Sequence, residues 1–275
     1  MRIGVIDSGV GGLSILNAVR ESVPAQYIYC MDNQYLPYGT KSELFIRQRL
    51  LQLTRHLLEQ YKVDLVLIAC NTATTQAVDY LRQQFELPFV GVVPAIKPAA
   101  HYCGIQPFAV LATQATVNGP YIEQLVAEFA PKNDVQLIAS SELVLLAEQK
   151  VWYRCDVTTE VRRVLLDTPL VQSKAAALVL GCTHFPFLAD EIRACLGQSV
   201  RLFDTAEAIA RRVKQLQLQF GLSQQEDGVA DVFVSTAALD LIQQGRLAEL
   251  GFGQHQCWPN PAGAEQVYSS VSSLS

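Results

Sequence analysis

The chain has 275 residues, a formal net charge of −5 at pH 7 and a sequence pI near 5.4. Its hydrophobic content of 50% is enough to bury one large core or two modest ones. The acidic balance of charge, without a cluster of Lys and Arg, argues against a nucleic-acid partner. The longest apolar runs have about eight residues, short of the roughly 20 needed to cross a bilayer, so we expect no membrane partner.

The N-terminus and the cysteines indicate the compartment. Residues 1–7 read as a strand from the start and leave no space for a signal peptide, so we expect a cytoplasmic protein. The seven cysteines are an odd number without a Cys-x-x-Cys pair, which favours reduced thiols over a disulfide framework. Cys182-Thr183-His184 offers two candidate zinc ligands, but nothing nearby supplies the others, so we expect no metal site.

Strand and helix patterns alternate along the chain, which is typical of an α/β protein with mainly parallel sheets. The predicted strands are Arg2–Ile6, Gln26–Met31, Leu65–Ala69, Phe89–Val93, Phe108–Ala112, Val135–Ala139, Ala177–Leu180, Val200–Phe203 and Asp231–Ser235. Apolar residues three and four positions apart predict helices over Lys41–Tyr61, Thr74–Phe85, Asn118–Phe129, Asp156–Leu166, Ala206–Phe220 and Thr236–Leu247. Residues 259–275 are rich in Pro, Gly, Ala and Ser, and we expect a flexible tail.

A weak internal duplication predicts two similar lobes, each a mainly parallel sheet flanked by helices, related by pseudo-two-fold symmetry. Residues 3–9 begin one half and residues 108–114 begin the other, and an apolar run ending in a cysteine follows in each. We expect a first lobe of residues 1–95 and 207–258, and a second lobe of residues 96–206. Facing lobes would bring the carboxyl ends of their strands to one cleft. The alternative is that strand–turn–helix units look alike in any α/β protein.

Cys70 and Cys182 each end a short apolar run and precede polar residues, so both occupy the same kind of structural position. Two such thiols suit a reaction that removes a proton from one face of a substrate and returns one to the opposite face. A racemase has this requirement, because its substrate and product are mirror images. The other cysteines are more typical of small buried hydrophobic residues or surface thiols.

The glycine-rich segment 9–14 is a poor match to nucleotide-binding motifs, with Ser14 where a third glycine is needed and no P-loop lysine. Asp7, at the end of the first predicted strand, would repel a pyrophosphate and suits a cation such as a substrate ammonium. Alternatively, Asp7 or Ser8 caps the helix that begins near Gly11.

The polar residues after each cysteine suit an anion. Asn71 and Thr72 stand at a strand-to-helix turn, where free backbone N–H groups can bind a carboxylate and lower the pKa of a nearby thiol toward neutrality. Helix capping is the alternative for both residues. His184, two positions after Cys182, can exchange a proton with that thiol. In Pro37-Tyr38-Gly39, a tight turn can direct N–H groups into the same cleft, or it is an ordinary surface turn.

Together, the segments 6–13, 37–39, 70–73, 112–116 and 181–186 resemble glutamate racemases, cofactor-independent members of the aspartate/glutamate racemase superfamily. The resemblance implies that Cys70 and Cys182 are the catalytic acid/base thiols and that no cofactor is required. The residues it implies as substrate contacts are Asp7, Ser8, Pro37, Tyr38, Gly39, Asn71, Thr72, Thr113, Thr116, Thr183 and His184. The family's supporting acid/base groups are matched here by Asp7, His184, Asp32 and Glu148. Leu145, however, stands where many relatives have another acidic residue.

The resemblance also implies a substrate pose, a partner and a role. The α-carboxylate of L- or D-glutamate would meet Asn71, Thr72 and Thr183, its ammonium Asp7, and its side-chain carboxylate Ser8 and the Tyr38-Gly39 turn. Cys70 would deprotonate the D-enantiomer and Cys182 the L-enantiomer. The family forms homodimers and supplies D-glutamate for peptidoglycan synthesis.

Two alternatives stay open at this stage. An aspartate racemase would use the same thiols, and a Cys–His hydrolase could use Cys182 and His184 but would leave Cys70 without a role.

Overall fold

The computed structural model describes residues 1–172, 174–197, 199–222 and 229–258, which form two parallel β-sheets flanked by helices. The first sheet has the order β10-β9-β2-β1-β3-β4 and the second β6-β5-β7-β8. Their strands are β1 (Arg2–Asp7), β2 (Gln26–Met31), β3 (Leu65–Ile68), β4 (Phe89–Gly91), β5 (Phe108–Ala112), β6 (Val135–Ala139), β7 (Ala177–Leu180), β8 (Arg201–Phe203), β9 (Val232–Ser235) and β10 (Gln254–Cys257). The predicted α/β fold class is confirmed.

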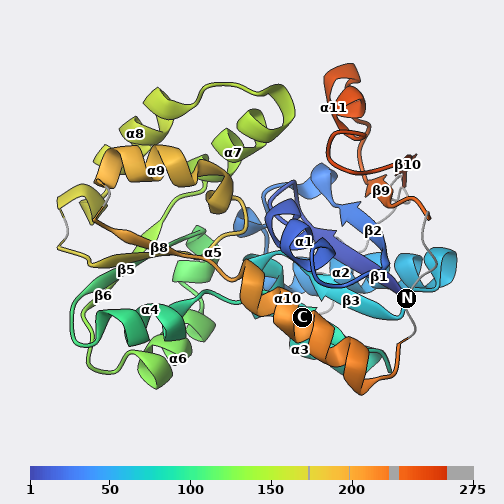
Figure 1. Ribbon diagram of the computed structural model, residues 1–275, viewed down its shortest axis with the longest axis horizontal. Helices are drawn as coiled ribbons and strands as arrows, with labels where there is room; N and C mark the ends of the chain where they lie inside the picture. The colour runs from blue at the N-terminus through green and yellow to red at the C-terminus, as the bar shows by residue number, and fades with distance from the viewer. Residues whose placement is uncertain (173, 198, 223–228, 259–275) are drawn as a thin grey trace, which may run out of the picture.

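The helices lie on both faces of each sheet, and Figure 1 shows the two lobes side by side. The α-helices are α1 (Leu13–Arg20), α2 (Glu43–His56), α3 (Asn71–Gln84), α4 (Ile96–Cys103), α5 (Gln114–Val117), α6 (Pro120–Phe129), α7 (Glu142–Tyr153), α8 (Thr158–Leu166), α9 (Ala189–Leu196), α10 (Ala206–Gln219) and α11 (Leu241–Arg246). A π-helical turn, η3 (Leu57–Tyr61), extends α2, and the 3₁₀ turns are η1 (Asn33–Tyr35), η2 (Tyr38–Thr40), η4 (Pro169–Gln172) and η5 (Phe185–Leu188).

The strand order supports the internal duplication. Within the first sheet, β2-β1-β3-β4 follow one another in space as β6-β5-β7-β8 do in the second. Strand β3 therefore corresponds to β7, and β1 corresponds to β5. Because the strands are parallel, their carboxyl ends lie at one edge of each sheet, which is where open α/β sheets bind ligands.

Alternation of side chains along the strands explains why each sheet carries helices on both faces. In β3, Leu65 and Leu67 join the core beneath α1 and α10, whereas Val66 and Ile68 join the core beneath α2 and α3. In β7, Leu178 packs toward α7, α8 and α9. Its neighbour Val179 packs toward α4 and α6. Figure 1 shows these two helices on the opposite side of the sheet from α7, α8 and α9. Strands buried on both faces read as continuous apolar runs.

The C-terminal part of the first lobe differs from the prediction. The helix predicted over Thr236–Leu247 is wrong for its first part, because α11 begins only at Leu241, where Asp240 and Gln243 form a capping box. Thr236 instead donates its hydroxyl hydrogen bond to Asp32. Strand β10 was not predicted, since Gln254–Cys257 is exposed and has no apolar alternation. The tail predicted for residues 259–275 lies outside the described residues.

Helix α7 joins the two lobes. Its residues Leu143, Val144 and Ala147 pack in the core of the second lobe, whereas Val151 and Trp152 pack in the core of the first. A helix that packs in both cores helps to fix how the lobes face each other. Among the described helices, none is long and apolar enough to span a membrane.

Candidate active site

The two cysteines singled out in the sequence lie in one pocket at the carboxyl ends of corresponding strands. Cys70 follows β3 and Cys182 follows β7, and both thiols are buried, with 7% and 6% of the residue exposed. The pocket is lined from the first lobe by Ser8, Pro37, Tyr38, Gly39, Cys70, Asn71 and Thr72, and from the second by Thr113, Val144, Cys182 and His184. The structure therefore presents a thiol from each lobe to the same small space.

Asp7 lies beside this lining, fully buried at the end of β1. Its Oδ1 accepts a hydrogen bond from the Gly9 backbone N–H at 2.7 Å, and its Oδ2 accepts one from the Thr183 hydroxyl at 3.2 Å. Burial raises the pKa of Asp7 to about 7, and the opposite charge of His184 moderates that rise. The carboxyl therefore links the lobes and can gain or lose a proton near neutral pH.

His184 connects the Cys182 thiol to Glu148. Its Nδ1 lies 3.8 Å from Cys182 Sγ, and its Nε2 lies 2.7 Å from Glu148 Oε1. Burial alone would lower the pKa of His184, but hydrogen bonds and charge interactions with Cys182 and Glu148 outweigh burial and raise it well above its usual value. The imidazole is thus placed to exchange a proton with the thiol while a carboxylate fixes its orientation.

Glu148 is held from both lobes. Its Oε1 accepts a hydrogen bond from the Val10 backbone N–H at 2.7 Å, and its Oε2 accepts one from Trp152 Nε1–H at 3.0 Å. Sequence reasoning missed Trp152. Its position four residues after Glu148 on one helix face was the signal available.

Cys70 precedes α3 and accepts hydrogen bonds from the Ala73 backbone and the Ser8 side chain. Burial nevertheless raises the pKa of the Cys70 thiol above its usual value, and the Asp7 charge raises it further. The expected lowering toward neutrality is therefore wrong for this closed pocket, because desolvation of the thiolate outweighs the helix N-terminus. The resting form of Cys70 is the neutral thiol.

Threonine hydroxyls close the pocket across the lobes. Thr72 Oγ1 lies 2.9 Å from Thr113 Oγ1, and Thr113 Oγ1 lies 3.1 Å from Thr116 Oγ1. The Asn71 Oδ1 atom is buried and has no hydrogen-bond partner in the described part of the chain. A buried polar atom of this kind is available to a ligand.

The helix-capping alternatives are wrong for these residues. The N-cap of α1 is Gly12 and that of α3 is Cys70, and within the described residues neither helix start has a side-chain cap bond. Asp7, Ser8, Asn71 and Thr72 are therefore free of that local role. The surface-turn alternative is also wrong for Tyr38, whose exposed fraction is 1%.

The glycine-rich segment allows the lobes to pack closely. A Cβ atom on Gly9 would lie 2.0 Å from Glu148 Oε1, and one on Gly11 would lie 2.3 Å from His184 Nδ1. Both distances are far below van der Waals contact, so only glycine fits the present geometry.

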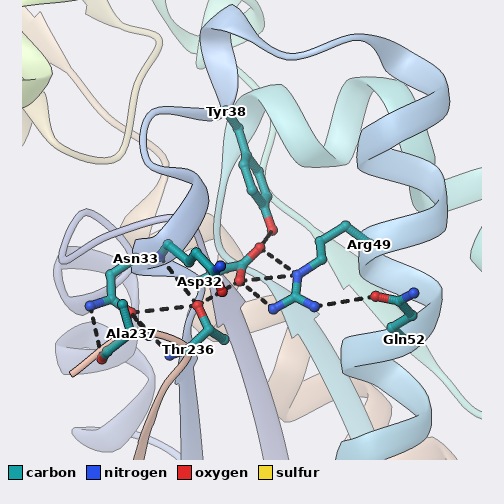
Figure 2. Close-up of polar contacts among 8 residues, drawn as sticks. Asp32, Asn33, Tyr38, Arg49, Gln52, Thr236 and Ala237 are labelled. Carbon is teal, nitrogen blue, oxygen red and sulfur yellow. Dashed lines mark hydrogen bonds and ion pairs between the residues drawn. The ribbon is translucent and has the colours of Figure 1, made fainter. Parts of the chain in front are cut away.

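Asp32 is not among the described residues that line the pocket. It lies beneath Tyr38, and its carboxylate accepts the Tyr38 hydroxyl hydrogen bond at 2.5 Å and forms an ion pair with Arg49 at 2.7 Å, as Figure 2 shows. Sequence reasoning also missed Arg49. Its position within the buried stripe of α2, between Ile46 and Leu53, indicates a buried partner.

Within the described residues, no group of three or more His, Cys, Asp and Glu side chains is arranged to hold a metal ion. The pocket lining carries two thiols, an imidazole, hydroxyls and one side-chain amide, and the carboxyl groups of Asp7 and Glu148 lie beside it. These groups suit proton transfer to and from a small polar molecule with both cationic and anionic groups.

Comparisons with known proteins agree with this chemistry. A glutamate racemase of Aliivibrio fischeri (strain MJ11) is 41% identical over 259 residues, which cover 94% of this chain and 97% of the relative. The crystal structure of Escherichia coli glutamate racemase with L-glutamate and the activator UDP-MurNAc-ala has a TM-score of 0.85 and 35% identity, covering 94% of this chain and 98% of that one. The Thermus thermophilus glutamate racemase structure with beta-chloro-D-alanine has a TM-score of 0.72 and 32% identity, covering 94% and 96%. The family model for Asp/Glu/hydantoin racemases matches residues 3–213, and this chain belongs to that family.

Proposed function

We propose that this protein interconverts L- and D-glutamate by proton transfer between Cys70, Cys182 and the α-carbon, and that it supplies D-glutamate for peptidoglycan synthesis. The observation that carries the proposal is the presence of both thiols in one pocket, each at the end of a corresponding strand of its lobe. The substrate is taken from the relatives named glutamate racemase, one of which is described in complex with L-glutamate.

The two thiols act in opposite protonation states. In the L-to-D direction, Cys182 is the thiolate that removes the α-proton, and Cys70 is the thiol that donates a proton to the opposite face. In the D-to-L direction the roles are exchanged. The neutral form of Cys70 in the free protein, and the imidazole beside Cys182, fit the L-to-D starting state. The pair titrates as a coupled unit, since one thiol must be charged while the other is neutral.

The polar lining orients the substrate. The α-carboxylate meets Asn71, Thr72 and Thr183, and the ammonium faces Asp7. The side-chain carboxylate meets Ser8 and the backbone of the Tyr38-Gly39 turn, while Thr113 and Thr116 fix Thr72 from the second lobe. Hydrogen-bond donors in a buried pocket stabilise the charge that develops when the α-proton leaves.

Isotope exchange in D₂O tests the two-thiol scheme. Starting from L-glutamate, the product receives a deuteron from Cys70, whereas the remaining substrate keeps its α-hydrogen in early turnovers. The circular dichroism signal should therefore pass beyond zero before it returns, because protiated substrate reacts faster than deuterated product. Cys70→Ser and Cys182→Ser should each abolish racemisation. A monotonic approach to zero, or robust activity in Cys182→Ser, would contradict the scheme.

The same proposal covers the wider assembly. We assign residues 1–95 and 207–258 to the first lobe and residues 96–206 to the second, which is supported by the strands of each sheet falling within these ranges. A homodimer in the cytoplasm is the proposed state of the protein, supported by the family resemblance. Sedimentation equilibrium of the purified chain should give twice the 30.3 kDa monomer mass, and a monomer would reject this assembly.

A further inference from the structure

A buried ion pair lies directly beneath the active-site tyrosine. Asp32 is fully buried and Arg49 is 4% exposed. Arg49 Nε lies 2.9 Å from Asp32 Oδ2, and Arg49 Nη2 lies 2.7 Å from Asp32 Oδ1, so the guanidinium binds the carboxylate as a fork (Figure 2). Taking two charges out of water is costly, and such a pair is weak grounds for stability alone. A role in orienting other groups is the better explanation.

The remaining bonds of Asp32 lead to the pocket. Its Oδ2 accepts the Tyr38 hydroxyl hydrogen bond at 2.5 Å, and its Oδ1 accepts that of Thr236 at 2.7 Å. Burial and the adjacent Asp32 charge raise the pKa of Tyr38 well above its usual value, so the hydroxyl stays protonated and donates. Tyr38 begins η2 and lines the pocket, and its neighbour Gly39 packs against Thr113 of the second lobe. The Tyr38 hydroxyl therefore anchors a turn that faces the substrate.

Aromatic rings cover the Arg49 guanidinium. Its central carbon lies 5.1 Å from the ring centroid of Tyr35 and 5.2 Å from that of Trp258. Trp258 follows β10 and stacks on His56, with ring centroids 4.2 Å apart. The rings thereby shield the fork, and a residue that follows the edge strand β10 contributes to this support.

We propose that Arg49 is a positioning residue for racemisation: through Asp32 it holds the Tyr38-Gly39 turn against the substrate, and Trp258 shields this contact. Arg49 acts on substrate binding and not on proton transfer, because it lies outside the pocket lining and reaches the pocket through Asp32 and Tyr38. The kinetic part of this inference rests on the proposed glutamate racemase function.

Arg49→Lys tests the role of the fork. Lysine keeps the positive charge, but an ammonium cannot make the paired contacts of a guanidinium. We expect KM for glutamate to rise about fivefold to tenfold, as for the loss of one hydrogen bond of ordinary strength, with kcat within about twofold. L- and D-glutamate have equal free energies, so kcat/KM must fall by the same factor in both directions. Arg55→Lys, an exposed arginine in the last turn of α2, is the matched control and should leave both constants unchanged.

A double-mutant cycle separates positioning from general damage. Tyr38→Phe removes the hydroxyl through which Arg49 acts, so adding Arg49→Lys to it should raise KM by less than about twofold. Inhibition by glutarate, which has two carboxylates, should weaken in Arg49→Lys more than inhibition by 2-aminobutyrate, which lacks the second one. Fully additive effects on KM, or equal weakening of both inhibitors, would overturn the positioning role.

Thiol alkylation gives a readout that does not depend on glutamate turnover. Displacement of the turn should increase the rate at which iodoacetamide modifies Cys70, measured by peptide mass spectrometry, several-fold in Arg49→Lys. Cys103 is buried in the core of the second lobe, away from Arg49, and should keep its wild-type rate. Equal increases at Cys70 and Cys103 would show general loosening and reject the inference. If the wild-type protein does not racemise glutamate, the proposed function is wrong. The alkylation rates still test whether Arg49 holds the Tyr38-Gly39 turn in place.

Trp258→Ala covers the case in which Arg49→Lys does not fold. It leaves the Asp32–Arg49 ion pair intact and removes only the covering ring. We expect a rise in KM of about twofold and faster alkylation of Cys70 in the same direction. If KM and the rate of Cys70 alkylation in Trp258→Ala equal the wild-type values, Trp258 has no part in positioning the turn. If both also equal the wild-type values in Arg49→Lys, the proposal is wrong.

Discussion

Replacement of Gly9 by alanine should disable the site without removing any polar group. The added methyl would lie 2.0 Å from Glu148 Oε1 and 2.9 Å from His184 Nε2, too close to both atoms that form the 2.7 Å contact. Relief requires a shift of more than about 1 Å, because carbon–oxygen contacts normally exceed 3 Å. Gly9 does not have a positive φ, so alanine can adopt its backbone and the effect is purely steric.

The size of the effect follows from what must move. Overpacking in a filled interior costs about 1–3 kcal/mol, and loss of a charge-assisted hydrogen bond adds about 1.5–3 kcal/mol. The free energy of unfolding should therefore fall by about 2.5–6 kcal/mol. Misplacing His184 by about 1 Å should lower kcat/KM by about a hundredfold. Gly245→Ala is the control, since among the described residues no atom lies within 4 Å of its added carbon and alanine favours helix α11.

Racemisation followed by circular dichroism and urea unfolding at pH 7 measure the two effects. Gly245→Ala should be fully active and about 0.5–1 kcal/mol more stable. A Gly9→Ala protein with wild-type kcat/KM would show that the lobes are not held in this close contact, and the argument for glycine at position 9 would be refuted.

Three further predictions concern Asp7, Trp152 and the cap of α11. Between its usual pKa of 3.8 and about 7, Asp7 keeps a proton that the unfolded chain loses, so stability falls as pH rises. Asp7→Asn should remove this slope in urea unfolding between pH 5 and 8. Trp152→Phe loses the hydrogen bond to Glu148 and should lower kcat/KM about tenfold; an unchanged value would contradict it. Asp240→Ala should lower unfolding free energy by about 1–2 kcal/mol, measured by urea unfolding, with unchanged racemisation.

Much of the fold was predictable because its signals are local. Strands β1, β3, β5 and β7 are buried on both faces, and such strands appear as short apolar runs that end in polar residues. Strand β10 carries no such signal, since it is an exposed edge strand of Gln and His residues next to a cysteine. Its position is determined by pairing with β9, which the sequence does not encode as a local pattern.

The pocket residues were predictable where they stand next to the strands that carry them. Cys70 and Cys182 follow predicted strands, and parallel pairing brings strand ends together, so their neighbours Asn71 and His184 come with them. The turn at Tyr38 was predicted, but the Asp32 contacts that hold it were not. Arg49 and Thr236, which bind Asp32, come from distant parts of the chain. A contact between side chains of distant elements leaves no local pattern in the sequence, so it could not be predicted.

The amino-acid sequence by itself determined the fold class, the pair of thiols and the family, because apolar periodicity and short polar motifs are local properties. Only the tertiary structure decided which form of the active-site thiol is favoured and which contacts hold the active-site residues in place. The pKa of Cys70 is raised, not lowered, since burial removes water that the thiolate needs. The glycines at 9 and 11 serve the approach of Glu148 and His184, and this close packing exists only once the two lobes have met.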